Sequence, residues 1–453
     1  MNAPPPNARP RLARWAAHRR AGGRGRLEAW VERWSEPLFA LATLTWLWSL
    51  SVQARVPAST SLLTMAGLTL VRGLGTPGGR AEVAALPGRP DYYLPAGLVA
   101  AYLVVFAWTP EPALAWERVE AASQLLLLPV AFFVWRGHLR RWGGAYRAAA
   151  VGFAAAGAAA VAGYALANHD ALLVALGQGR AVPVPRGQHA TYAAFLAFAS
   201  LAGLDAAARG PSRGARIWGG ACACVTAAAL HLVAVRTGLV LCYLGVAGYG
   251  LRLALARMRP LPALGAVAAG VAVVAAAASH LPGVERRLAY ARYDLERAFD
   301  ARAVANSDGG RVLSFRAGAA VIADDPWRGA GPRGMGAAMH REYDRMGHAG
   351  ARHSPTNQWL FSWTHAGVLG FLGVWLALLA PLAERGWWRR PLVAEWVAMT
   401  AAWWTVEPPL ATAAGPGVAL AFLLLAKASP LPAAVVDAGG APARTPSVGG
   451  AGG

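Results

Sequence analysis

The sequence predicts an all-α polytopic membrane protein with about 12 transmembrane helices and one large loop between spans 9 and 10. Three observations support this fold class. Hydrophobic residues make up 56% of the 453 residues and charged residues only 15%, whereas soluble domains carry about 25% charged residues. Apolar runs of about 17–25 residues, the length that crosses a bilayer, recur along the chain. The sequence lacks the alternating segments of about ten residues that a transmembrane barrel needs.

The strong positive charge is explained by topology. The chain has a net charge of +20 and an isoelectric point near 11.1, a balance that also occurs in nucleic-acid-binding proteins. Most of the arginine, however, lies in short loops between apolar runs, where basic residues fix the orientation of the spans. We therefore expect the lipid bilayer, and no nucleic acid, among the partners. Three cysteines lie within apolar runs and are expected to be buried small residues rather than metal ligands: Cys222, Cys224 and Cys242.

The chain divides into five regions. These are a basic cytoplasmic tail (1–35), spans 1–9 (36–279), a large outer loop (280–356), spans 10–12 (357–427) and a disordered tail rich in Ala, Pro and Gly (428–453). The spans are expected near 36–54, 57–75, 93–109, 118–135, 147–167, 190–207, 217–234, 237–254, 261–279, 357–381, 391–406 and 411–427.

Charge alternates between successive loops. With the N-terminus inside, the inner loops are rich in arginine, and they lie at 72–89, 136–147, 209–216, 252–259 and 385–390. The short outer loops carry acidic residues instead, with Glu111 and Glu117 in one and Glu407 in another. This positive-inside pattern supports the span count and predicts that both termini are cytoplasmic.

Two outer segments break this pattern. The loop at 168–189 contains Arg186 and His189, and the turn between spans 7 and 8 contains Arg236. Topology does not explain arginine at the outer face, and ionisable residues at membrane depth indicate a functional site. The alternative for Arg236 is that its side chain extends to the outer headgroups.

The outer loop at 280–356 is the only long polar region between spans. Apolar spacing predicts a helix over 285–302, a break at Asp308-Gly309-Gly310 and a second helix over 312–322. The Pro- and Gly-rich run 326–334 is expected to be irregular, and its glycines would permit close backbone approach to a ligand. We expect the chemistry of the protein in this region.

The order of motifs resembles the O-antigen ligase and O-antigen polymerase superfamily of bacterial envelope proteins. The resemblance covers roughly 180–380. It rests on an Arg-aromatic pair, an Asp-Asp-Pro turn, an Asn followed by two spaced glycines, and two outer arginine segments: Arg311 with Phe315, the run 324–331, Asn357 with Gly367 and Gly370, Arg236, and the run 186–189. The family has a histidine immediately before the asparagine. Here that position is Thr356, and the nearest histidine is His353.

This resemblance implies a glycosyltransferase of lipopolysaccharide biosynthesis. The family transfers a glycan from an undecaprenyl-diphosphate carrier to a hydroxyl group of lipid A-core or of a growing glycan. The reaction takes place at the periplasmic face of the bacterial inner membrane. We expect no cofactor and no metal, because adjacent carboxylates before a proline, such as Asp324 and Asp325, are typical turn residues.

The residues suit this chemistry. A leaving diphosphate needs fixed cations, and arginine offers planar, permanently charged donors. We expect Arg311 and Arg236 to be catalytic in this way. His353 is the expected base, with His189, His340 and His348 as weaker candidates. The residues expected to bind substrate are Arg186, His189, Arg328, Arg333 and Asn357. Two plainer alternatives remain open: His353 is a loop histidine without a catalytic role, and Asn357 only caps span 10.

The motifs leave several functions open. Within the superfamily, they do not distinguish a ligase from an O-antigen or exopolysaccharide polymerase. Outside the superfamily, the alternatives are a transporter or flippase of a lipid-linked glycan and a structural membrane protein. A transporter is expected to carry charges deep in several spans and often an internal repeat. The polar residues here cluster at one face instead.

Overall fold

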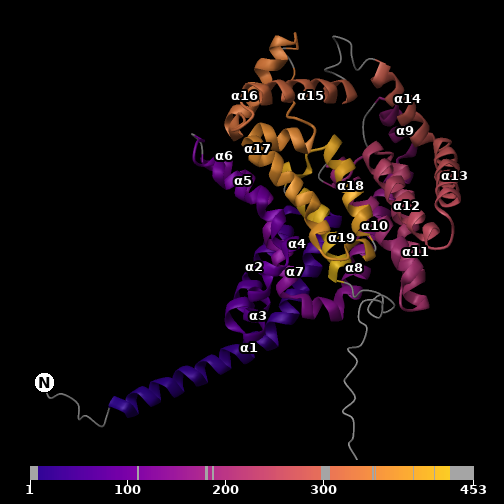
Figure 1. The fold of residues 1–453 in the computed structure, drawn as a ribbon. Helices are drawn as coiled ribbons and strands as arrows, with labels where there is room; N and C mark the ends of the chain where they lie inside the picture. The colour runs from indigo at the N-terminus through magenta and orange to yellow at the C-terminus, as the bar shows by residue number, and fades with distance from the viewer. Residues whose placement is uncertain are drawn as a thin grey trace, which may run out of the picture.

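The structure is a computed structural model. It describes residues 9–109, 112–178, 182–185, 188–296, 307–348, 351, 353–390, 392–412 and 414–428. All regular secondary structure in these ranges is helical (Figure 1). The predicted all-α class is therefore confirmed.

Six helices in the described ranges are long and apolar enough to cross a membrane. They are α8 (Arg136–Ala167), α10 (His189–Arg209), α11 (Arg213–Val233), α12 (Arg236–Leu255), α13 (Pro260–Ser279) and α17 (Gln358–Leu379). The other predicted spans correspond to helices that are shorter or less apolar: α1 (Arg9–Ser51), α2 (Arg55–Gly75), α5 (Gly97–Val105), α7 (Gln124–Val134), α18 (Val393–Val406) and α19 (Gly415–Ala428). These apolar helices support a polytopic membrane protein, and the number of 12 spans stays a prediction.

Helix α10 forms the centre of the bundle. In the most apolar 18-residue stretch of α10, 78% of residues are buried, against 11% in the corresponding stretch of the peripheral helix α13. It packs against α8, α11, α12 and α19. Small residues permit the close contact with α11, because a Cβ added to Gly203 would lie 2.8 Å from the carbonyl oxygen of Gly219. This is the packing expected of helices in lipid.

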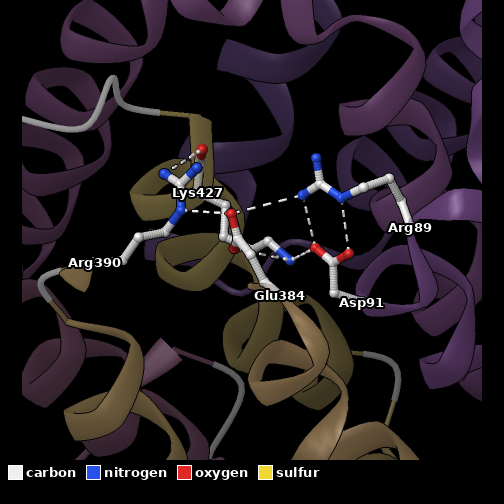
Figure 2. A network of polar contacts seen from close by, with 5 residues as sticks. All are labelled: Arg89, Asp91, Glu384, Arg390 and Lys427. Carbon is white, nitrogen blue, oxygen red and sulfur yellow. Dashed lines mark hydrogen bonds and ion pairs between the residues drawn. The ribbon is translucent and has the colours of Figure 1, made fainter. Parts of the chain in front are cut away.

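The loops predicted on the inner side meet at one end of the bundle. Arg89 and Arg390 belong to one ion network with Asp91, Glu384 and Lys427 (Figure 2). The Arg252 guanidinium lies in the same area, since its Nη1 donates to the carbonyl oxygen of Arg390 at 3.3 Å.

The loops predicted on the outer side meet at the other end. Arg118 donates to the carbonyl oxygen of Ala411 at 3.4 Å, and Arg311 donates to Glu407 at 2.7 Å. The helices of the large loop cover this end, at the top of Figure 1, whereas α3 (Pro77–Ala85) lies at the opposite end. The structure therefore groups the loops as their charges predict. Which end faces the cytoplasm stays a prediction.

The large loop contains three described helices, α14 (Pro282–Glu296), α15 (Ser307–Asp324) and α16 (Gly331–Arg345). The two predicted helices correspond to α14 and α15, and residues 297–302 lie outside the described ranges. The predicted break at Asp308-Gly309-Gly310 is wrong, because these residues form the first turn of α15.

Helix α16 was not predicted. The irregular segment is confined to 325–330, and Pro332 lies in the first turn of the helix, where its missing N–H costs nothing. Its apolar side buries Met335, Met339 and Tyr343 against Leu313 of α15 and Phe361 of α17. The loop helices thus share a small core with the outer half of α17.

Candidate active site

The site is built around a break in α17. At Ala366 (φ −135°, ψ 18°) and Gly367 (φ 60°, ψ −152°) the backbone leaves the helical conformation. The turn at 325–330 fills the break, because the N–H of Val368 donates to the carbonyl oxygen of Pro326 at 3.0 Å and the N–H of Ala330 donates to that of Thr364 at 2.8 Å. The turn therefore supplies hydrogen bonds that the broken helix lacks.

Glycine makes this contact between the turn at 325–330 and the break in α17 possible, and we call the contact the interlock. A Cβ added to Gly367 would lie 1.9 Å from the carbonyl oxygen of Trp327, and one added to Gly329 (φ +67°) would lie 2.6 Å from that of Trp363. Asp325 acts as a turn residue, since its side chain accepts from the N–H of Arg328 at 3.0 Å. The glycines of the run 326–334 were expected to permit close approach of a ligand. Gly329 instead permits close approach of the turn to the backbone of α17.

Arg311 lies in the first turns of α15 and pairs with a carboxylate of a distant segment. Its Nη2 donates to Oε1 of Glu407, the residue that follows α18. Both side chains keep partial access to solvent, at 28% and 25%. Burial raises the pKa of Glu407, and the Arg311 guanidinium opposes that shift. The pair joins the large loop to the outer end of α18.

The His353 ring lies beside the backbone that precedes Arg311. A Cβ added to Gly310, the residue before Arg311, would lie 3.7 Å from Nε2 of the His353 ring. The Tyr343 hydroxyl donates to the backbone carbonyl of His353 at 2.8 Å and fixes the segment, while the imidazole is exposed. The hydroxyl of Thr356 lies 2.9 Å from that of Ser314. Two of the three predicted catalytic residues, Arg311 and His353, thus lie at one corner.

Asn357 holds the start of α17 in place. Its Oδ1 accepts from the N–H of Leu360 at 3.1 Å, as a helix cap does, and its Nδ2 donates to the carbonyl oxygen of Thr405 at 2.8 Å. Both ends of the amide are therefore used within the protein. This geometry supports the capping role, and a contact with substrate stays a prediction.

Arg236 starts α12 on a neighbouring part of the outer end. The tight turn before it contains Ala234 in the left-handed conformation (φ 50°), which is uncommon for a residue with a side chain. Nη2 of Arg236 lies 3.6 Å from Oδ2 of Asp294, a fully buried residue of α14. Because α14 contacts α15, the Arg236 pair and the Arg311 pair belong to adjoining elements.

The other predicted binding residues are more scattered. Arg328 is exposed on the turn at 325–330, and Arg333 is exposed in the first turn of α16. His189 is partly exposed at the first residue of α10. Arg186 lies outside the described residues.

Sequence reasoning missed the acidic partners of the arginines. Glu407 was assigned only to an outer loop, and Asp294 was given no role. A signal was present for Glu407, because a carboxylate next to an apolar span is costly without a partner. The sequence did not indicate which arginine would be that partner.

No protein-family model matches the chain, and no curated protein matches its sequence. The resemblance to the O-antigen ligase superfamily therefore depends on the ordered motifs alone. The geometry of the residues that carry these motifs is the remaining basis for a function.

Proposed function

We propose that this protein is a membrane glycosyltransferase of the O-antigen ligase type. It moves a glycan from an undecaprenyl-diphosphate carrier to an acceptor hydroxyl at the periplasmic face of the inner membrane. One observation carries the proposal: the Arg311–Glu407 pair and the exposed His353 ring lie together at the outer end of the bundle, beside the start of α17. A fixed cation and a potential base are the groups that this transfer needs.

The arginines would bind the diphosphate of the donor. Arg311 and Arg236 each have a carboxylate partner and keep 28% and 31% of their side chains exposed. A diphosphate carries more negative charge than one carboxylate and offers oxygens to both forks of a guanidinium. In the proposed complex it takes over the exposed donors of Arg311, and the charge that develops as it leaves is stabilised there.

The transfer step balances with a single base. The acceptor O–H gives its proton to the base while its oxygen bonds to the anomeric carbon of the donor sugar. The bond from that carbon to the phosphate oxygen breaks, and the undecaprenyl diphosphate leaves with the electron pair. His353 is the proposed base because its imidazole is exposed beside Arg311. Glu407 is the second candidate, since burial raises its pKa and makes it a better proton acceptor than an ordinary glutamate.

The polymerase and ligase alternatives share this chemistry and differ in the acceptor. In a ligase the acceptor is lipid A-core, and in a polymerase it is a growing glycan chain. The geometry at Arg311 and His353 suits both, so the products must distinguish them.

A deletion strain of the source bacterium tests the proposal. Surface polysaccharide and lipid-linked intermediates are separated after complementation with wild type, Arg311→Ala, His353→Ala, Glu407→Gln and Arg316→Ala. Arg316 is the matched control, because it is exposed on the same helix as Arg311. We expect wild type and Arg316→Ala to restore the glycan and Arg311→Ala to fail at equal expression.

The products distinguish a ligase from a polymerase, and the His353 and Glu407 variants identify the base. Full-length lipid-linked polymer beside bare lipid A-core in the deletion strain indicates a ligase, and single repeat units indicate a polymerase. Restoration by His353→Ala but not by Glu407→Gln moves the base to Glu407. Unchanged glycans in the deletion strain, or full activity of Arg311→Ala, would contradict the proposed transferase.

A further inference from the structure

A large cavity opens at the end of the bundle opposite Arg311. Its volume is about 880 Å³, and its walls come from α8, α10, α11, α19 and the segment before α18. Four arginines line it, from three of the loops predicted to be cytoplasmic: Arg140, Arg147, Arg209 and Arg390. Arginine at this density in a concave wall is unlike the scattered charge that topology alone requires.

The walls carry excess positive charge. Asp205 is the only acidic residue among the described residues that line the cavity, and it is held by Arg147 at 3.4 Å, by Arg209 and by the Tyr249 hydroxyl at 3.0 Å. Because Arg390 is paired with Glu384 at 2.7 Å, three arginines against this one aspartate leave an excess of two positive charges in the described wall. Arg140 is exposed and makes no ion pair with any residue that the structure describes. An anion entering the cavity would therefore meet guanidinium groups already held in place.

One wall of the cavity has features typical of a membrane interface. Trp218 lines it, is 51% exposed, and donates from its indole N–H to the carbonyl oxygen of Ala148 at 3.2 Å. The neighbouring Ile217 is also exposed. Tryptophan prefers the level of the lipid headgroups. Ala148 and Val151 continue the wall as an apolar surface, which suits the glycerol and upper acyl region of a lipid.

The cavity is distinct from the candidate active site. Arg390 lies just before α18 and Glu407 just after it, and this helix has 14 residues. At 1.5 Å per residue the helix separates the two regions by roughly 21 Å.

We propose that this arginine-lined cavity binds a phosphate-bearing anion at the membrane interface. Basic pockets between transmembrane helices on the cytoplasmic side accept anionic lipid headgroups, and the exposed tryptophan places the opening where such phosphates lie. Free phosphate presents the same chemistry, so the test separates the two sources. The proposal does not rest on the glycan transfer, because binding is its readout.

Native mass spectrometry of the purified full-length protein, loaded with cardiolipin, phosphatidylglycerol or phosphatidylcholine, tests the site. Arg140→Glu reverses the charge of a side chain that lacks a described ion pair. Gly144→Leu fills the cavity without a change of charge, because an added Cβ there meets no atom within 4 Å. Arg257→Glu is the control, since Arg257 is exposed on another loop of the same end and does not line the cavity.

We expect wild type and Arg257→Glu to retain cardiolipin and phosphatidylglycerol over phosphatidylcholine. Arg140→Glu should weaken this binding by about fivefold or more, as expected from the loss of one basic contact near a membrane surface. Gly144→Leu should also weaken it, because the new side chain occupies the space of the ligand. Displacement of both anionic lipids by millimolar inorganic phosphate assigns the site to a soluble phosphate. Equal retention of all three lipids without an effect of phosphate, or wild-type binding by both variants, would overturn the proposal.

Discussion

The two ends of the helical bundle use arginine differently. At one end Arg89 and Arg390 belong to a network in which Lys427 and Asp91 are almost completely buried, with side-chain exposures of 2% and 1% (Figure 2). At the other end Arg311 and Arg236 each meet a carboxylate and keep about a third of their surface exposed. Residues of one type thus fasten segments together in the buried network and stay accessible in the two pairs at the other end.

The difference teaches where a ligand has room to act. A buried network with several partners is satisfied from within, and it joins α19 to the segments around Asp91 and Glu384. A partly exposed arginine presents guanidinium N–H groups to an incoming anion. Lys427 lies in the last turn of α19, so the buried network is at the end of this helix rather than in its middle. It therefore does not supply the deep intramembrane charges expected of a transporter.

The largest expected effect is on the buried network. Asp91→Ala removes the nearer carboxylate of Lys427 and leaves the buried ammonium with only Glu384, at 3.7 Å, which should lower the free energy of unfolding by about 3–5 kcal/mol. Thermal unfolding of the detergent-purified protein measures it. The double variant Asp91→Leu with Lys427→Met should recover most of the loss, because an apolar pair of similar size replaces the ions. A single variant as stable as wild type would show that this network does not fasten the helices.

At the outer end the expected effect is on activity. Arg311→Ala should reduce glycan transfer by about 10²–10³-fold, the usual result of losing a donor to developing negative charge. Its partly exposed ion pair should contribute only about 1 kcal/mol or less to stability. Transfer assays with lipid-linked donor, together with unfolding curves, separate the two quantities. Equal loss of both in Arg311→Ala, with Arg316→Ala unchanged, would make Arg311 a fastening residue like those of the buried network.

The interlock between the turn and α17 gives an intermediate effect. Gly367→Ala places a methyl group against the carbonyl of Trp327 and strains a positive φ, which should cost about 1–3 kcal/mol. Gly336→Ala in α16 is the control, because an added Cβ there meets no atom within 4 Å. This control should stabilise the helix by up to about 1 kcal/mol. Unfolding curves of the two variants that coincide would argue against the interlock.

The cap at the start of α17 gives a smaller effect. Asn357→Ala should destabilise the protein by about 1 kcal/mol, as loss of a helix cap does. Asn357→Asp keeps the oxygen that accepts from Leu360 but loses the donor to the carbonyl of Thr405, so its stability should lie between those of wild type and Asn357→Ala. A strong loss of transfer in Asn357→Asp at unchanged stability would instead support the predicted substrate contact.

The smallest effect concerns the pH dependence of stability. The pKa of Glu407 is raised in the folded protein, so the folded state holds this proton more tightly than the unfolded state. The resulting stabilisation is present at low pH and is lost as pH rises through the raised pKa. Glu407→Gln does not titrate. The stability of wild type relative to this variant should therefore improve as pH falls from 7 toward about 5, and a change in the opposite direction would contradict the shift.

The sequence was sufficient for the fold class and for the grouping of the loops. Apolar length and arginine placement are local properties, and the bilayer makes them decisive. Helix α15 could likewise be predicted from its apolar spacing. Helix α16 could not, because Gly331, Gly334 and Gly336 reduce its intrinsic preference and only contacts with α15 and α17 stabilise it.

The site was less predictable. The motifs located Arg311, His353 and the turn at 325–330, but each was assigned a role toward a ligand. The structure shows that much of the turn serves α17, because its carbonyls and amides complete the hydrogen bonds of the break at Gly367. The partners Glu407 and Asp294 come from segments about a hundred and about sixty residues away from Arg311 and Arg236. Periodicity and spacing do not indicate such pairs.

The interlock at Gly367 also determines how the outer part of the molecule can move. The segment that joins α15 to α16 is hydrogen-bonded to α17 and packed tightly against it, so α15 and α16 cannot move away from α17 without breaking these contacts. The outer portion of α17, residues 358–366, must travel with them. The pivot of such a motion is the non-helical joint at 366–367. For the proposed transferase, admitting a lipid-linked donor at this end would therefore require α17 to bend at this joint.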